Sequence, residues 1–209
     1  MLSNKKIRML ELLDKQVGTC QKCSLSPNGT AIPHWSPVSK YVIIGEAPGY
    51  NEVRNKTPFV GAAGKILTDL LGEIGFKKSE FLIINSVQCR PVEGNRNAKP
   101  NLTQLSVCQH YIRKYITVIN PEKILCLGNY AKYIFTEDIT GILRQRGVFK
   151  TLSLREKEYP VLFTIHPAYC IYNQEDGVPM LREDIKLFKD TEFEKESEWL
   201  FTEDEFTIF

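Results

Sequence analysis

Four short apolar runs, separated by stretches with helical spacing, limit most strongly how this chain can fold. The runs cover residues 41–45, 81–85, 123–127 and 161–165. Continuous apolar runs of this length are typical of strands that are buried on both faces. Strands that alternate with helices form parallel sheets with helices on both sides. We therefore predict an α/β fold, a three-layer α/β/α sandwich with a central four-stranded parallel sheet.

The segments between these runs divide into helices and loops by their apolar spacing. The predicted helices are residues 4–17, 62–74, 102–119, 129–136 and 180–189. Residues 92–101 are rich in Asn, Gly and Pro, and residues 141–159 lack a clear period, so both are predicted to be irregular.

The last twenty residues differ in charge from the rest of the chain. Residues 190–209 carry eight acidic side chains and one lysine, so the overall charge of +2 leaves +9 on residues 1–189. We predict one domain over residues 1–189 and a flexible acidic and aromatic tail over residues 190–209. A basic body favours a nucleic-acid partner. The tail is a candidate binding segment for a replication or repair protein.

The composition also bears on the cellular compartment. No run approaches the about 18 apolar residues that a membrane helix needs, and the N-terminus lacks a signal-peptide core. We expect a cytoplasmic monomer that does not associate with membranes. In that compartment six cysteines indicate metal binding or catalysis rather than disulfides.

Four of the cysteines form a candidate metal site. Cys20 and Cys23 have a metal-ligand spacing, and Cys89 and Cys108 lie in or beside predicted loops. Cys126 lies inside an apolar strand and is expected to be a buried hydrophobic residue. Four thiolates suit an iron–sulfur cluster or a structural zinc ion, and their spacing leaves both open.

Polar residues end three of the four predicted strands. These residues are Glu46, Asn85 and His166. Because the carboxyl ends of parallel strands share one rim, we expect the three side chains to meet there, with Phe59 nearby. Each has a structural explanation by itself, such as a turn-capping role for Asn85 or a core position for Phe59. Together they favour a pocket for a flat heterocycle.

Seven segments of the chain form a recognisable series: Gly45–Gly49 with Glu52, Pro58–Gly61 with Gly64, Asn85 with Cys89–Pro91, Pro100 ahead of a helix with Cys108, Leu127–Gly128 with Ala131, Arg146–Gly147 and His166–Tyr169. In these segments, which span roughly residues 18–188, the chain resembles the family-4, iron–sulfur uracil-DNA glycosylases.

The resemblance implies hydrolysis of the N-glycosidic bond of uracil in DNA, which leaves an abasic site. It also implies a 4Fe–4S cluster on Cys20, Cys23, Cys89 and Cys108, with structural zinc as the alternative. A base inside a duplex must be flipped out before it can be cut. The main alternative is a non-catalytic DNA-binding module of the same fold.

The expected roles follow from the chemistry of uracil. Asn85 would read the N3–H and O4 groups, and Phe59 would stack on the ring. His166 and the backbone N–H groups at Glu46 and Ala47 would stabilise negative charge on O2. The resemblance places catalytic weight on both Glu46 and Glu52, either of which can orient the attacking water.

Further residues are expected to contact the DNA itself. Residues 168–172 would be pushed into the base stack as an apolar wedge. Candidate phosphate contacts, which position DNA without reading its sequence, are Arg90, Arg96, Lys99, Arg144 and Arg146.

Overall fold

The computed structural model describes residues 1–154 and 157–193. Its helices are α1 (Asn4–Gly18), α2 (Tyr50–Asn55), α3 (Ala62–Glu73), α4 (Leu102–Ile119), α5 (Gly128–Thr136), α6 (Ile142–Gln145), α7 (Pro167–Tyr172) and α8 (Gln174–Asp190). Its strands are β1 (Tyr41–Gly45), β2 (Phe81–Asn85), β3 (Val92–Glu93), β4 (Arg96–Asn97), β5 (Lys123–Leu127), β6 (Phe149–Leu154) and β7 (Lys157–Thr164).

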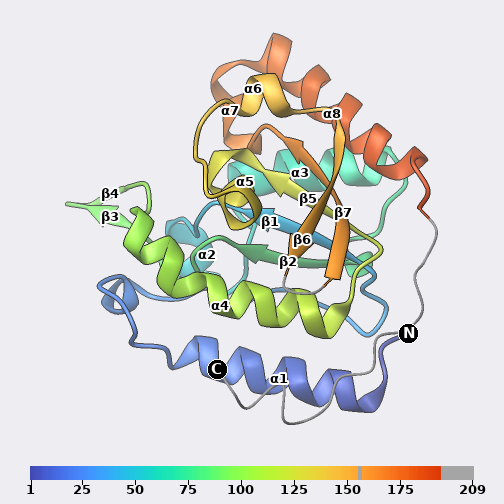
Figure 1. Cartoon of the computed structure of the whole chain (residues 1–209). Coiled ribbons are helices and arrows are strands. Elements are labelled where there is room, and N and C mark those ends of the chain that lie inside the picture. The colour runs from blue at the N-terminus through green and yellow to red at the C-terminus, as the bar shows by residue number, and fades with distance from the viewer. Residues whose placement is uncertain (155–156, 194–209) are drawn as a thin grey trace.

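The central sheet has the strand order β2-β1-β5-β7-β6 (Figure 1). The first four strands run parallel, and β6 pairs antiparallel with β7 from Phe149 opposite Leu162 to Leu154 opposite Lys157. The predicted α/β architecture is confirmed, but the prediction of four strands was wrong. Most residues of β6 are partly exposed, and its sequence, Phe-Lys-Thr-Leu-Ser-Leu, lacks the continuous apolar run of a doubly covered strand.

Helices cover both faces of the sheet (Figure 1). Ile44, Ile84 and Phe163 pack in one hydrophobic cluster with residues of α1, α4 and α5. Ile43 and Ile83 pack in a second cluster with residues of α3 and α8. Neighbouring strand residues thus alternate between two cores, which explains why the parallel strands read as unbroken apolar runs.

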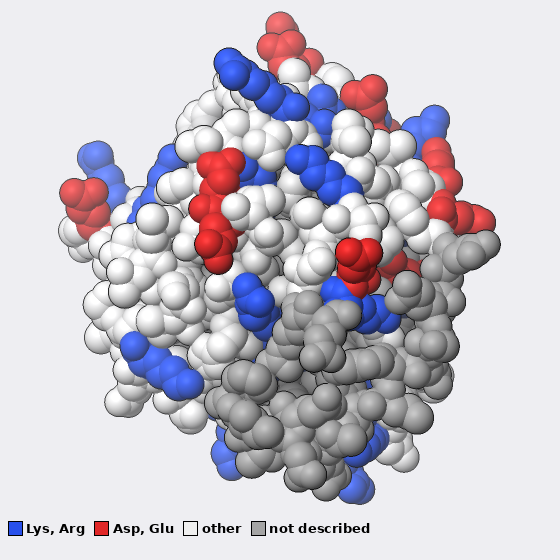
Figure 2. Space-filling model, viewed as in Figure 1, with Lys and Arg blue, Asp and Glu red and all other residues white. Residues whose placement is uncertain are grey.

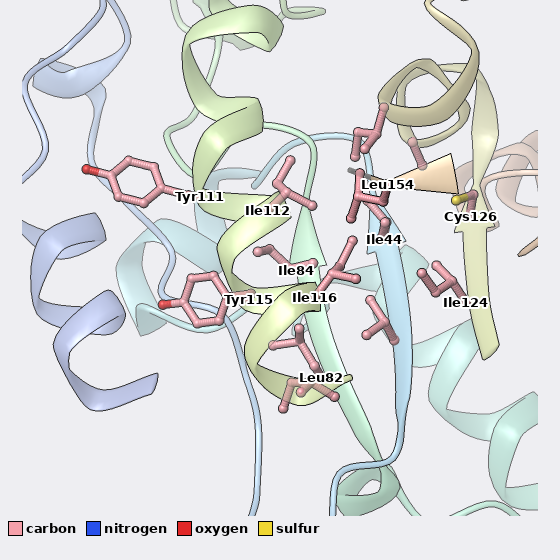
Figure 3. Packing of buried hydrophobic residues seen from close by; sticks show 14 of the residues in the cluster. Ile44, Leu82, Ile84, Tyr111, Ile112, Tyr115, Ile116, Ile124, Cys126 and Leu154 are labelled. Atoms are coloured by element: carbon pink, nitrogen blue, oxygen red, sulfur yellow. The ribbon is translucent and has the colours of Figure 1, made fainter. Parts of the chain in front are cut away.

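Helix α4 joins α1 to the sheet. Figure 3 shows Tyr111 and Tyr115 directed toward α1, while Ile112 and Ile116 point toward the strands. The Tyr115 hydroxyl donates to Asp14 Oδ1 over 2.6 Å. This hydrogen bond holds the C-terminal part of α1 beside α4, and Cys20 lies two residues beyond the last residue of α1.

Several short elements lie where the sequence predicted none, including helix α6, which with β6 falls inside residues 141–159, a segment predicted to be irregular. Helices α2 and α7 have six residues each, too few to show a helical period. Strands β3 and β4 form a hairpin around Gly94, inside residues 92–101, which were also predicted to be irregular. Helix α8 begins six residues earlier than predicted and includes Asp190. Residues 194–209, most of the predicted tail, lie outside the described residues.

The surface of the described residues carries mixed charge on the face in Figure 2. Basic and acidic side chains are interspersed there, with wide neutral areas between them. Among residues 1–154 and 157–193, no helix is both long and apolar enough to cross a membrane.

Candidate active site

A pocket of about 380 Å³ opens at the rim where β1, β2 and β7 end. Its walls include five residues that the sequence singled out: Ala47, Glu52, Phe59, Asn85 and His166. They come from segments far apart in the chain, as expected for the shared carboxyl edge of parallel strands. Three strand connections and helix α7 therefore build one concave site.

Glu46 is placed differently from its two expected neighbours. In the described part of the chain it is not among the residues that line this pocket. Burial raises the pKa of its carboxyl group, and the charge of Lys99 partly opposes that change. Burial raises the pKa of Tyr130, and the charge of Glu46 adds to that rise, so Glu46 interacts electrostatically with both Lys99 and Tyr130. A catalytic role for Glu46 stays a prediction.

Asn85 is the last residue of β2 and is 2% exposed. Its side-chain Nδ2 is a buried nitrogen that lacks a hydrogen-bond partner within the described residues. Leaving a buried donor unpaired costs about 1–3 kcal/mol, so such a group indicates a ligand. Gly45 lies beside it in the sheet, and a Cβ there would come within 2.6 Å of Phe59 Cζ. The glycine lets the amide and the ring approach each other.

His166 precedes Pro167 at the start of α7 and caps that helix. The backbone N–H of Ala168 donates to His166 Nδ1 over 3.2 Å. Burial lowers the pKa of the imidazole from 6.5 to about 4, so the ring is neutral at neutral pH. Because Nδ1 accepts, the single ring proton resides on Nε2, which makes Nε2–H the available donor.

Phe59 is buried, and its ring centroid lies 6.0 Å from that of His166. Its backbone is left-handed, with φ of 56°, which is unfavourable for a bulky residue. Glu52 offsets that cost because its carboxylate accepts from the Phe59 N–H and, over 2.5 Å, from the Gly49 N–H. Gly64 completes the fit, since a Cβ there would lie 2.6 Å from Phe59 Cα.

This geometry makes Glu52 a positioning residue as well as a wall of the pocket. The substitution Glu52→Gln replaces one acceptor oxygen with an NH₂ group that faces a backbone N–H. We expect the free energy of unfolding, measured by urea titration, to fall by about 1–3 kcal/mol. Because Phe59 would be displaced, we also expect a larger KM in steady-state assays. Glu93→Gln, on the exposed β3–β4 hairpin, is the matched control. Unchanged stability with a lower kcat alone would instead assign Glu52 to the chemical step.

The sequence analysis missed some of the pocket residues, Tyr50 and Asn97 among them, and placed Ile171 and Tyr172 on the expected wedge. Tyr50, Asn97, Ile171 and Tyr172 line the pocket, and Tyr172 is 85% exposed. Cys170, in the predicted wedge segment, is fully buried instead. A signal existed for Ile171 and Tyr172, which are apolar or aromatic residues on the expected wedge. No sequence signal indicated Asn97.

Two arginines proposed as phosphate contacts have partners inside the protein. Arg146 makes an ion pair with Asp184, with both donor–acceptor distances 2.8 Å, and donates to the Met180 carbonyl. Arg90 Nε donates to Asn97 Oδ1 over 2.6 Å, and its guanidinium lies 5.4 Å from the centre of the Tyr50 ring. Arg146 is thus a structural residue, whereas Arg90 braces the β3–β4 hairpin at the pocket mouth.

A second, almost wholly apolar cavity is lined by all four cysteines of the predicted metal site: Cys20, Cys23, Cys89 and Cys108. Val17, Val87 and Tyr111 are among the other walls. Burial raises the pKa of Cys108 to about 12, and the neighbouring cysteines add to that rise. Four thiolates in this cavity would repel one another, and a metal centre would supply the positive charge that offsets the repulsion.

Two metal groups, a zinc ion and a 4Fe–4S cluster, are candidates for this cavity. A tetrahedral zinc ion draws its sulfurs to about 2.3 Å from one point. Among the residues that the structure describes, no three Cys, His, Asp or Glu side chains are grouped closely enough to hold a single metal ion. The four cysteines line one cavity, and a donor set of four thiolates fits a 4Fe–4S cluster.

The comparisons with known proteins agree on one family. A family model described as the uracil DNA glycosylase superfamily matches residues 32–192. The chain is 37% identical to a type-4 uracil-DNA glycosylase of Sulfurisphaera tokodaii, across 87% of this chain and 84% of that protein. Type-4 uracil-DNA glycosylases of Archaeoglobus fulgidus and Saccharolobus solfataricus are 33% and 35% identical, across 84% and 87% of this chain and 88% and 85% of theirs. The chain belongs to the uracil-DNA glycosylase superfamily and groups with its type-4 members.

Proposed function

We propose that this chain removes uracil from DNA by drawing the flipped nucleotide into the pocket between Phe59 and His166, and that it leaves an abasic site. The observation that carries the proposal is the buried Nδ2 of Asn85 in the wall of that pocket, for which the described part of the chain offers no hydrogen-bond partner. The family membership supports the same substrate, because the similar proteins are named uracil-DNA glycosylases.

Recognition of uracil rests on its hydrogen-bonding edge. Asn85 Nδ2 donates to O4, and Asn85 Oδ1 accepts from N3–H. Cytosine carries an amino donor at position 4 and an acceptor at N3, so both contacts become mismatched. Mismatched buried polar groups discriminate strongly between substrates. The Phe59 ring packs against one face of the base and supplies stacking without base specificity.

Bond cleavage places negative charge on O2 of the departing uracil. The neutral His166 ring donates to that oxygen from Nε2, while Ala168 holds the ring through Nδ1. A donor held in place before the reaction stabilises the developing charge without reorganisation. Glu46, whose buried carboxyl group interacts electrostatically with Lys99 and Tyr130, is the candidate for orienting water or balancing charge on the sugar.

The mouth of the pocket supplies the DNA contacts. Ile171 and Tyr172 lie at the end of α7 beside the pocket, and both are exposed. They are placed to fill the space that a flipped nucleotide leaves in the stack, a role for which Cys170 is too deeply buried. Tyr50, beneath Arg90, offers a second aromatic surface at the rim.

The direct test is incubation with an oligonucleotide that contains one uracil. The expected result is free uracil, detected by mass spectrometry, and cleavage of the strand at that position when alkali is added. Binding to the uracil oligonucleotide without base release would favour the alternative, a non-catalytic DNA-binding module of the same fold. A matching oligonucleotide with cytosine in place of uracil serves as the control.

We further propose that the four cysteines hold a 4Fe–4S cluster that fastens α1 and α4 to the segment after β2. The chemistry that such a group supplies at this position is structural cross-linking. Anaerobically purified protein is expected to contain four irons per chain and to absorb visible light. Cys108→Ala should abolish that absorbance, whereas Cys126→Ala, in β5 and outside the cavity, should retain it. One zinc per chain in colourless protein would contradict the proposal.

A further inference from the structure

Residues 85–89 connect the two sites within five positions. Asn85 lines the uracil pocket, and Cys89 lines the cysteine cavity. The residues between them are buried: Ser86, Val87 and Gln88 are 1%, 1% and 3% exposed. A rearrangement at one end of so short a buried segment must be absorbed by the other end or by the contacts between.

Those contacts leave the segment little freedom. The Ser86 N–H and hydroxyl both donate to the Gly45 carbonyl, over 2.9 and 2.7 Å. The Val87 N–H donates to the Glu46 carbonyl over 3.2 Å. The segment is therefore fastened to the end of β1, which forms the same rim of the sheet.

Gln88 has contacts with both sites at once. Its side-chain Nε2 donates to the backbone carbonyl of Asn85. Its backbone N–H donates to the sulfur of Cys108, and its own carbonyl accepts from the Ala31 N–H over 2.9 Å. Next to it, the Thr30 hydroxyl and Cys89 Sγ are hydrogen-bonded at 3.1 Å.

We propose that Gln88 is a positioning residue that couples occupancy of the cysteine cavity to the geometry of the uracil pocket. Ligation of Cys89 and Cys108 fixes the Gln88 backbone from two sides, and the Gln88 side chain then holds the Asn85 peptide in its reading position. A metal-bound thiolate is also a stronger acceptor for the Gln88 N–H than a free thiol. This inference rests on the proposed function and on the proposed cluster.

Coupling between two sites is reciprocal, which provides the test. If cluster ligation fixes Asn85, uracil held by Asn85 must in turn stabilise the ligated cavity. Cluster loss to a chelator and oxidant can be followed through the visible absorbance. We use an oligonucleotide with 2′-fluoro-2′-deoxyuridine, whose glycosidic bond resists cleavage, and a matching one with cytosine. In the unsubstituted protein, the uracil analogue is expected to slow cluster loss about five-fold or more relative to the cytosine oligonucleotide.

Gln88→Glu keeps the size of the side chain and the backbone N–H but replaces the donor with a carboxylate that repels the Asn85 carbonyl. We expect this variant to keep its visible absorbance and to lose the protection by the uracil analogue. Gln109→Glu is the matched control, because Gln109 Nε2 also donates to a backbone carbonyl, that of Ile134 in α5, over 3.0 Å and makes this contact outside residues 85–89. It should behave as the unsubstituted protein.

Equal protection in Gln88→Glu and in the unsubstituted protein would overturn the coupling, as would no protection in either. Binding measured in the same samples separates this failure from a failure of the proposed function. Protein that binds the uracil analogue more tightly than the cytosine oligonucleotide but shows no protection contradicts only the role of Gln88. Protein without that preference contradicts the uracil pocket itself.

Discussion

Replacing Asn85 with alanine is expected to lower kcat/KM for uracil release by about 10²–10³-fold, because it removes both hydrogen bonds to the edge of the base. The preference for uracil over cytosine should fall by a similar factor, since the amide that is mismatched with cytosine is gone. Single-turnover rates on oligonucleotides with uracil or cytosine at one position measure both effects.

The matched control for this substitution is Asn55→Ala. Asn55 is exposed near the end of α2, where its Nδ2 donates to the Asn51 carbonyl. Its removal should change kcat/KM by less than about three-fold, since surface substitutions away from such sites have small effects. A loss of rate in Asn85→Ala without any loss of discrimination would mean that Asn85 supports the fold rather than reads the base.

His166→Ala is expected to lower kcat by about 10²–10³-fold, with a smaller effect on binding, because the lost Nε2–H contact strengthens only as charge develops on O2. Single-turnover rates and the affinity for an uncleavable substrate separate the two effects. His34→Ala, which removes a partly buried histidine outside the pocket, is the control. An equal loss in both variants would point to general destabilisation.

The pH dependence tests the charge state of His166. Burial lowers the pKa of the folded-state imidazole from 6.5 to about 4, so His166 remains neutral as the pH falls from 8 to about 5.5. Over that range the rates of the unsubstituted protein and of His166→Ala should run parallel, with no inflection near pH 6.5 from this group. A rise in rate below pH 6.5 that disappears in His166→Ala would show that the imidazolium acts instead.

The parts of the fold that the sequence predicted are those with one dominant physical signal. Strands β1, β2 and β5 begin and end where predicted, because burial on both faces demands unbroken apolar runs. Strand β6 is at the edge of the sheet and carries polar residues, so no such run marks it. The β3–β4 hairpin has two residues in each strand, too few for any period.

The residues of the candidate site can likewise be separated into those that the sequence predicted and those that it did not. Asn85 and His166 were found because Asn85 ends β2 and His166 lies just beyond the end of β7, and strand ends meet at one rim. Glu46 also follows a strand, but within the described residues it is not part of the pocket wall, and residue order does not reveal the direction of its side chain. The hydrogen bond from the Phe59 N–H to the Glu52 carboxylate depends on the left-handed backbone at Phe59, and no residue preference predicts that conformation.

A crystal structure of the protein with an oligonucleotide that contains 2′-fluoro-2′-deoxyuridine examines the uracil pocket most directly. The expected structure has the base outside the stack and against Phe59, with the Asn85 amide on N3 and O4 and His166 Nε2 on O2. A uracil that remains paired in the duplex, or that binds without touching Asn85 and His166, would contradict the assignment of this pocket.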